Sequence, residues 1–150
     1  MKLGDLVDHI IKRSGGCLRF IIAIAGPPGA GKSTLSEQLC EILNARSIQS
    51  RIISMDGFHL ENLVLKELGL FDRKGSPNTF DVPAFIQVMQ RLAAHETDVA
   101  IPEFDRRKDI SIEDASTVFI QDKILIVEGN YLFLKDNKWV ELQPIWDDTI

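Results

Sequence analysis

Hydrophobic and polar residues alternate along the chain with two different periods, and each period predicts a type of element. The first dozen residues carry leucine, valine and isoleucine at helical spacing and are followed by Gly15-Gly16, which predicts a helix that ends there. The same spacing predicts helices over 32–45 and 61–68, and a further one that begins after Asp81 with Pro83 in its first turn. Continuous apolar runs predict strands over 18–25, 51–55, 99–101 and 124–127.

Two segments are less regular than these. Residues 69–80 are rich in glycine, proline and charge, which predicts a long loop. Residues 116–121 predict either another strand or one arm of a β-hairpin with the segment that follows. Strands that alternate with helices indicate one α/β domain over residues 1–150, with three layers and a mainly parallel sheet.

Composition and charge narrow the class of protein. The chain has 150 residues, 45% of them hydrophobic, and a formal net charge of −5, which argues against a basic nucleic-acid-binding surface. An anionic substrate must therefore be attracted by a local positive site. The two cysteines, Cys17 and Cys40, form no disulfide framework, and the apolar runs are too short to span a bilayer. We expect a cytoplasmic protein that binds neither membranes nor nucleic acids.

One glycine-rich segment carries most of the chemical information. Residues 26–33, GPPGAGKS, fit the pattern G-x-x-x-x-G-K-[ST] between a predicted strand and a predicted helix. Glycines let consecutive backbone N–H groups point at a phosphate, Lys32 can reach the β- and γ-phosphates, and the Ser33 hydroxyl can bind Mg²⁺. The residues expected to hold the nucleotide are Gly26, Pro27, Pro28, Gly29, Ala30, Gly31, Lys32, Ser33 and Thr34.

Two acidic residues follow apolar strands and complete the predicted chemistry. Asp56 comes directly after the strand over 51–55, and Glu128 ends the strand over 124–127. The carboxyl ends of parallel strands form the binding crevice of an open α/β sheet, so we expect both carboxylates near the glycine loop. We predict that Asp56, Glu128 and Ser33 contribute to a Mg²⁺ site. A guanine-specific GTPase is disfavoured, because NKWV (137–140) lacks the final aspartate of the guanine reader.

Five motifs in one order resemble the P-loop kinases that include uridine kinase, phosphoribulokinase and bacterial-type pantothenate kinase. The branch it resembles most is described as uridine kinase-like or fructose-transport-system kinase-like. The resemblance covers nearly the whole chain and implies a three-layer P-loop NTPase fold. The motifs are the glycine loop, MDGFH (55–59), RKGSP (73–77) with TFD (79–81), PEFDR (102–106) and VEGNYL (127–132).

The resemblance also implies roles for single residues. Asp56 matches the acid that accepts the proton of the substrate hydroxyl, Lys32 and Ser33 keep their phosphate and Mg²⁺ roles, and Glu128 matches the Mg²⁺ acid. Asp109 departs from the family pattern, because uridine kinases carry a base-binding histidine at that position. The residues predicted to contact the acceptor, or to bind an anionic group on it, are His59, Arg73, Phe80, Phe104, Asp105, Arg106 and Arg107.

The resulting functional hypothesis is transfer of the γ-phosphoryl group of ATP to a hydroxyl of a small metabolite, with Mg²⁺ as cofactor. The acceptor could be a nucleoside, a sugar or a pantothenate-like alcohol. The alternative is a nucleotide-binding module, or a slow ATPase that regulates a partner. Kinases of this family continue into another strand, an arginine-bearing lid and an adenine-side segment. We therefore expect a C-terminally incomplete fold with weak or no kinase activity, whose exposed sheet edge favours a homo-oligomer.

Overall fold

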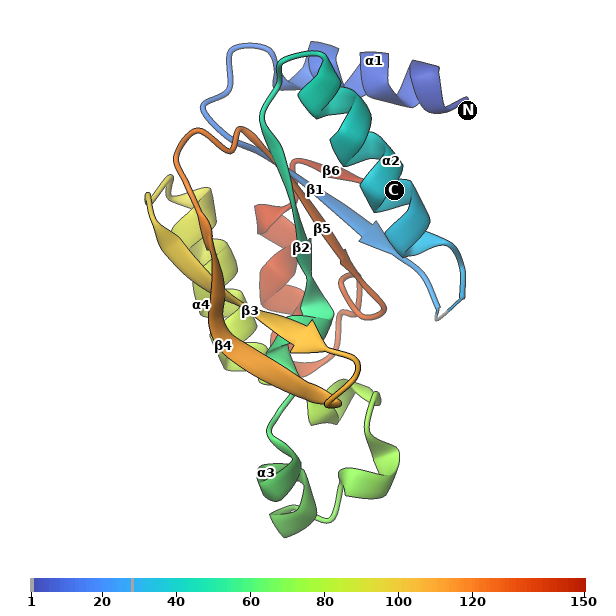
Figure 1. Ribbon diagram of the computed structural model, residues 1–150, viewed down its shortest axis with the longest axis vertical. Helices are drawn as coiled ribbons and strands as arrows, with labels where there is room; N and C mark the ends of the chain where they lie inside the picture. The colour runs from blue at the N-terminus through green and yellow to red at the C-terminus, as the bar shows by residue number, and fades with distance from the viewer. Residues whose placement is uncertain (1, 28) are drawn as a thin grey trace.

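Four parallel strands form the central sheet, in the order β2-β5-β1-β6 (Figure 1). The computed structural model describes residues 2–27 and 29–150, so Pro28 of the predicted phosphate loop lies outside the described residues. The strands are β1 (Phe20–Ala25), β2 (Ser50–Ser54), β5 (Ile124–Gly129) and β6 (Asp148–Thr149). Strand β5 lies between β1 and β2, so its carboxyl end is adjacent to the carboxyl ends of both neighbours.

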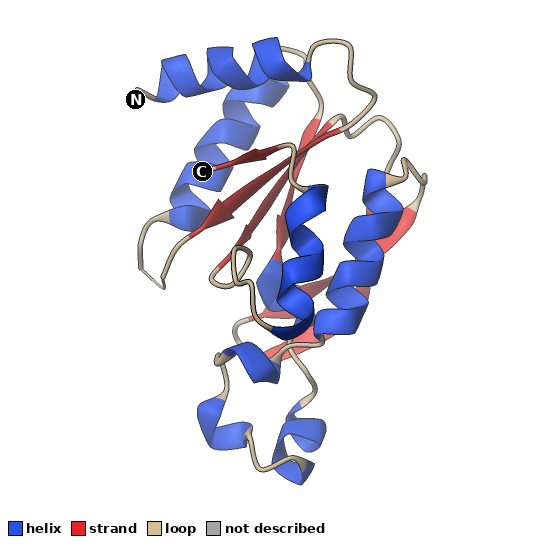
Figure 2. Cartoon of the chain, turned by 180° about the vertical axis from the view of Figure 1, so that it is seen from behind, coloured by secondary structure: helices blue, strands red, loops and turns tan. Residues whose placement is uncertain are grey.

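Helices cover both faces of this sheet, as the alternation of helices and strands predicts. Helices α1 (Leu3–Ser14) and α2 (Lys32–Ala45) pack on one face, against Ile22 and Ile24 of β1. Helix α4 (Val82–Ala93) and the 3-10 helix η4 (Asn137–Ile145) pack on the other, where the core includes Ile21 and Ala23. Figure 2 shows α4 and η4 in front of the sheet with α2 behind it.

The helix boundaries agree with the expectations from the sequence. Helix α2 begins and ends at the predicted residues, 32 and 45. The predicted cap of α4 is confirmed, because Asp81 Oδ1 accepts a hydrogen bond from the Ala84 N–H at 3.2 Å. Trp139 is buried in the predicted core, and Trp146 packs against it. In the described residues, no helix is both long and apolar enough to cross a membrane.

A β-hairpin outside the main sheet corrects two expectations. Strand β3 (Val99–Asp105) runs four residues beyond the predicted end, and β4 (Ile110–Val118) begins before the predicted segment. The two strands pair with each other in an antiparallel two-stranded sheet. Residues 116–118 thus belong to a strand, as one of our two alternatives had it, and the other alternative, a hairpin with the segment that follows, is wrong because β4 pairs with the segment before it. Because β4 is largely exposed and polar, its apolar pattern marks only the buried end of the strand, at Val118.

The helix predicted over 61–68 and the predicted long loop over 69–80 together form three short helical segments that project below the hairpin (Figure 1). Helix α3 (Asn62–Glu67) is followed by two 3-10 turns, η2 (Phe71–Arg73) and η3 (Pro77–Thr79). We call residues 60–79 the α3 segment. The 3-10 turn η1 (Met55–Phe58) joins it to the end of β2.

A buried polar cluster joins β2 to the turn that precedes β5. Asp122 is 2% exposed, and its carboxylate accepts hydrogen bonds from Gln49 Nε2, Arg51 Nε and the Phe119 N–H at 2.8, 2.9 and 2.9 Å. Arg19, also buried, donates to the carbonyl oxygens of Phe119 and Asp122 at 2.7 and 3.3 Å. Buried charges are tolerated only when they are paired in this way, so the cluster stabilises the amino-terminal end of the sheet, where β1, β2 and β5 begin.

Candidate active site

The glycine loop leaves β1 at the carboxyl edge of the sheet and enters α2. Gly29 and Gly31 have φ angles of 79° and 86°, a region that strains other residues, so this path requires glycine at both positions. Lys32 is the first residue of α2, and its Nζ donates a hydrogen bond to the Pro27 carbonyl oxygen at 3.1 Å. The loop therefore presents backbone N–H groups, a helix N-terminus and an ammonium group at one place.

Glu128 lies beside the start of this loop. In the strand register Glu128 is paired with Ile24 on one side and with Ser54 on the other, so it stands between the ends of β1 and β2. The residue is only 8% exposed. Asp56 follows two residues after Ser54, in η1. The register thus brings both predicted acids to the same edge of the sheet.

Asp56 and Glu128 line one cavity of about 330 Å³ between the main sheet and the hairpin. Phe104 and Arg106, two of the predicted acceptor residues, line it as well. Within residues 2–27 and 29–150, neither carboxylate has a hydrogen-bond or ion-pair partner, so both are free to act on a ligand. The sequence interpretation missed the other lining residues, which are Ile52, Ser54, Ile101, Pro102 and Glu103.

Close backbone packing holds Asp56 in place. The Asp56 N–H donates to the Ser54 hydroxyl at 3.2 Å, and the Asp56 carbonyl oxygen is 2.8 Å from His59 Nδ1. A Cβ on Gly57 would lie 2.5 Å from the Pro102 carbonyl oxygen, so only glycine lets η1 approach β3 this closely. The Asp-Gly pair in the sequence was the one available signal for this contact.

Three predicted acceptor residues form an aromatic stack beside the cavity. The His59 ring lies between Phe80 and Phe104, with ring centroids 4.1 and 4.8 Å apart. Phe80 is 5% exposed and also contacts Tyr131 and Trp139 edge-on. Phe80 is therefore the member of the stack that lies in the core, and Phe104 is the member that lines the Asp56 cavity.

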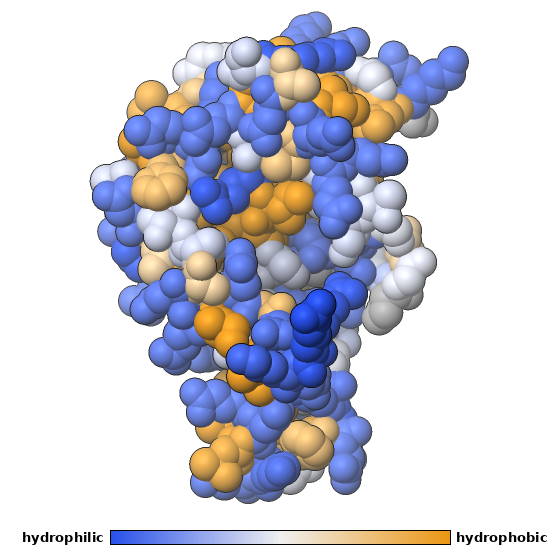
Figure 3. Space-filling model, viewed as in Figure 1, coloured by the Kyte–Doolittle hydropathy of each residue, from blue (hydrophilic) through white to orange (hydrophobic). Residues whose placement is uncertain are grey.

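The remaining predicted acceptor residues are placed differently. The Asp105 carboxylate accepts the N–H groups of Arg107 and Lys108 at 2.9 and 3.2 Å, so it shapes the hairpin turn. Arg73 is exposed in η2, outside the Asp56 cavity. Arg106, at the exposed tip of the hairpin, lines that cavity. Figure 3 shows strongly hydrophilic side chains gathered around the tip.

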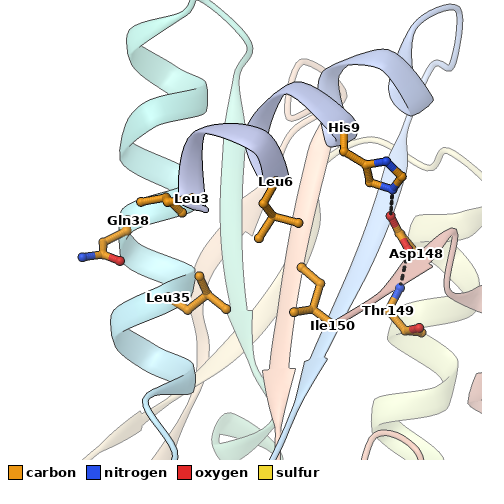
Figure 4. Close-up of a pocket in the computed structure, with 8 residues that line it drawn as sticks. All are labelled: Leu3, Leu6, His9, Leu35, Gln38, Asp148, Thr149 and Ile150. Atoms are coloured by element: carbon orange, nitrogen blue, oxygen red, sulfur yellow. Dashed lines mark hydrogen bonds and ion pairs between the residues drawn. The ribbon is translucent and has the colours of Figure 1, made fainter. Parts of the chain in front are cut away.

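A larger cavity, about 470 Å³, lies elsewhere and contains none of the predicted site residues. It lies between α1, α2 and the edge strand β6, and Figure 4 shows Leu3, Leu6, Leu35 and Ile150 around it. His9 closes one side by an ion-pair contact of 3.2 Å with Asp148. Because its lining is mainly aliphatic and lacks convergent acids or a phosphate loop, it is not the candidate active site.

The residues at the sheet edge fit a Mg²⁺-nucleotide. The loop has the backbone shape and the lysine that a phosphate chain requires, and no hydrogen bond within the described residues occupies the nearby carboxylates. Mg²⁺ is typically held through one or two carboxylates together with phosphate oxygens and waters. Asp56 and Glu128 supply that number, with the Ser33 hydroxyl at the start of α2 as a further oxygen.

The fold and the loop together define a P-loop nucleotide-binding protein. More narrowly, the chain belongs to the phosphoribulokinase/uridine kinase family, whose profile matches residues 21–142. A crystal structure from Silicibacter sp. TM1040, provisionally described as a fructose transport system kinase, superimposes with a TM-score of 0.89 at 40% identity, covering 99% of this chain and 73% of that one.

Two curated relatives are similar to this chain over part of their length. The uncharacterised protein YggC of Escherichia coli (strain K12) is 37% identical over 135 residues, which span 88% of this chain and 55% of that protein. The pantothenate kinase of Enterococcus faecalis (strain ATCC 700802 / V583) is 36% identical over 135 residues, spanning 87% and 44%. The chain thus spans about half the length of these two relatives.

Proposed function

We propose that this chain carries the phosphate-binding and acceptor-binding part of a small-molecule kinase that moves the γ-phosphoryl group of ATP to a hydroxyl. The observation that carries the proposal is the shared cavity of Asp56 and Glu128, beside the strand end from which the glycine loop departs. Family membership supports the same chemistry. Because both cysteines are free, we place the reaction in the reducing cytosol. Because the net charge of −5 disfavours binding to nucleic acid, we propose a small metabolite as the acceptor.

In this proposal each residue of the site has a defined role. The loop and Lys32 hold the phosphate chain, and Ser33, Glu128 and Asp56 would hold Mg²⁺, which would supply positive charge to the phosphates. Asp56 accepts the proton of the acceptor hydroxyl and orients its oxygen toward the phosphorus. Arg106 and Phe104 line the part of the cavity where the rest of the acceptor would lie.

Among acceptors, we favour a sugar or a pantothenate-like alcohol over a pyrimidine nucleoside. Uridine kinases carry a base-binding histidine where this chain has Asp109. The Asp109 carboxylate contacts Lys74 Nζ at 2.8 Å, and Asp109 is not among the residues that line the Asp56 cavity.

A panel assay of ATP consumption tests the proposal. The purified chain is incubated with ATP·Mg²⁺ and separately with pantothenate, fructose, other sugars and uridine. We expect consumption to rise measurably above the background rate with a sugar or with pantothenate and to stay at the background rate with uridine. ATP consumption that no acceptor changes would favour the alternative, a nucleotide-binding module or slow ATPase.

Loss of the Lys32 ammonium should weaken nucleotide binding independently of the acceptor. Lys32→Ala removes a charge-assisted contact to phosphate, which costs ~1.5–3 kcal/mol, or roughly ten- to a hundredfold in affinity. Titration calorimetry with ATP·Mg²⁺ measures the change. Lys12→Ala, at an exposed position on α1, is the control and should bind as the parent does. Equal affinity of Lys32→Ala and the parent would remove the loop from nucleotide binding.

A further inference from the structure

Lys74 belongs to the RKGSP motif, and no step of the proposed reaction uses it. Its side chain is 14% exposed, although lysine is seldom buried without a partner. The ammonium donates to Asn62 Oδ1 at 2.8 Å, to Asp109 Oδ2 at 2.8 Å and to the Asp109 carbonyl oxygen. An ammonium group has three N–H donors, so these three acceptors satisfy it completely.

These contacts join two parts of the chain that are far apart in sequence. Asn62 begins α3, Lys74 follows η2, and Asp109 stands at the tip of the β3–β4 hairpin. Asp109 has a φ of 54°, a conformation that non-glycine residues adopt infrequently and that tertiary contacts must hold. Lys74 therefore fastens the α3 segment to the hairpin tip.

The same ammonium lies against one wall of the Asp56 cavity. Lys74 Nζ is 5.5 Å from the centroid of the Phe104 ring, within the range of a cation–π contact. Phe104 lines the cavity and stacks on His59, whose Nδ1 contacts the Asp56 carbonyl oxygen. Contacts thus run without interruption from Lys74 through Phe104 and His59 to Asp56.

We propose that Lys74 is a positioning residue that determines how well the cavity binds its acceptor. By holding the hairpin tip against the α3 segment, it keeps Phe104 at the distance from Asp56 that the acceptor requires. The phosphate loop follows β1, which β5 separates from β2, and the residues of the loop that the structure describes make none of these contacts. Lys74 should therefore affect acceptor binding and leave nucleotide binding unchanged. The identity of the ligand in this inference rests on the proposed function. The attachment of the hairpin tip to the α3 segment rests on the Lys74 contacts alone.

The first test needs no enzymatic activity. Lys74→Met keeps the aliphatic length and removes the charge, and Asp109→Asn weakens the other side of the contact. Loss of a charge-assisted hydrogen bond should raise amide hydrogen exchange in residues 103–112 and 62–79 by roughly ten- to a hundredfold, with the central strands unchanged. Lys66→Met, on the same segment with its Nζ over Phe71, is the matched control and should leave hairpin exchange at the parent level.

The second test separates positioning from a merely structural role. With the acceptor that the panel assay identifies, Lys74→Met should raise the acceptor KM roughly tenfold, with kcat and the KM for ATP within about threefold of the parent. The double variant Lys74→Met/Asp109→Asn should be no worse than Lys74→Met alone, because Lys74→Met already removes the contact that Asp109→Asn weakens. An unchanged rate of amide hydrogen exchange in the hairpin would overturn the proposal. So would faster exchange together with an unchanged acceptor KM. If no acceptor is found, the proposed function fails, and the exchange measurement still decides whether Lys74 fastens the hairpin.

Discussion

Replacement of Asp56 by asparagine is expected to lower kcat for phosphoryl transfer by about 10²–10⁴-fold, the usual contribution of a general base. Asparagine keeps the size of the side chain and its backbone contacts to Ser54 and His59, but it cannot accept a proton. The affinity for ATP·Mg²⁺ should stay within a few-fold of the parent, because the phosphate loop is unaltered. Single-turnover kinetics and titration calorimetry measure the two quantities separately.

Glu103 provides a matched control for this variant. Glu103 lines the same cavity, so Glu103→Gln removes one negative charge from it without altering Asp56. We expect Glu103→Gln to retain most of the turnover that Asp56→Asn loses. An equal loss in both variants would mean that total negative charge, and not proton acceptance by Asp56, governs the rate.

The largest expected effect on stability is at Asp122. Asp122→Ala leaves Arg51, Gln49 and the Phe119 N–H without their acceptor inside the protein, and breaking a buried pair in this way costs about 3–5 kcal/mol. Such a loss is a large part of the 5–15 kcal/mol that stabilises a typical domain. Urea denaturation of the parent and the variant measures the difference in the free energy of unfolding.

An exposed ion pair in the same chain is the control for this measurement. Asp8 contacts Arg46 at 2.8 Å, and both side chains are largely exposed to solvent. Asp8→Ala should therefore cost only about 0.2–1 kcal/mol. If Asp122→Ala and Asp8→Ala lower the free energy of unfolding equally, burial does not strengthen the Asp122 contacts, and the cluster does not stabilise the sheet.

The Asp122 contribution should also depend on pH. Burial by itself raises the pKa of this carboxyl, but the hydrogen bonds from Gln49, the Phe119 N–H and Arg51 outweigh it and hold the pKa below its ordinary value. A lowered pKa in the folded state means that the stabilisation is complete above the unfolded value, about 3.9 for aspartate, and is lost as the pH falls through the folded value. The difference between the parent and Asp122→Ala should therefore shrink below about pH 4.

Most of the main sheet and the phosphate loop could be predicted because their signals are local. The continuous apolar run before GPPGAGKS predicts a strand buried on both faces, and the structure places Phe20–Ala25 there. Gly29 and Gly31 take backbone angles that other residues avoid, so their requirement is visible in the sequence itself. The positions of Asp56 and Glu128 followed from one topological rule, that parallel strands end at the same edge of a sheet.

The hairpin and the acceptor wall were harder to predict for a physical reason. Strand β4 is mostly exposed, so it lacks the apolar pattern of a buried strand, and the close approach of η1 to Pro102 of its partner strand β3 is a tertiary contact that no local pattern predicts. Phe80 and Phe104 are both aromatic residues near turns of polar sequence, yet the first lies in the core and the second lines the cavity. Residue type alone does not distinguish these two environments.

The sequence by itself determined the elements, the phosphate loop and the edge of the sheet where the acids lie, because periodicity, glycine conformation and strand order act over short stretches of chain. Only the tertiary structure decided which side chains form the cavity and what holds them. The Lys74 contact with Asp109 spans 35 residues, and the Arg51 contact with Asp122 spans 71. Such pairs form only after the chain has folded, when packing fixes which of several charged residues lie within hydrogen-bond distance.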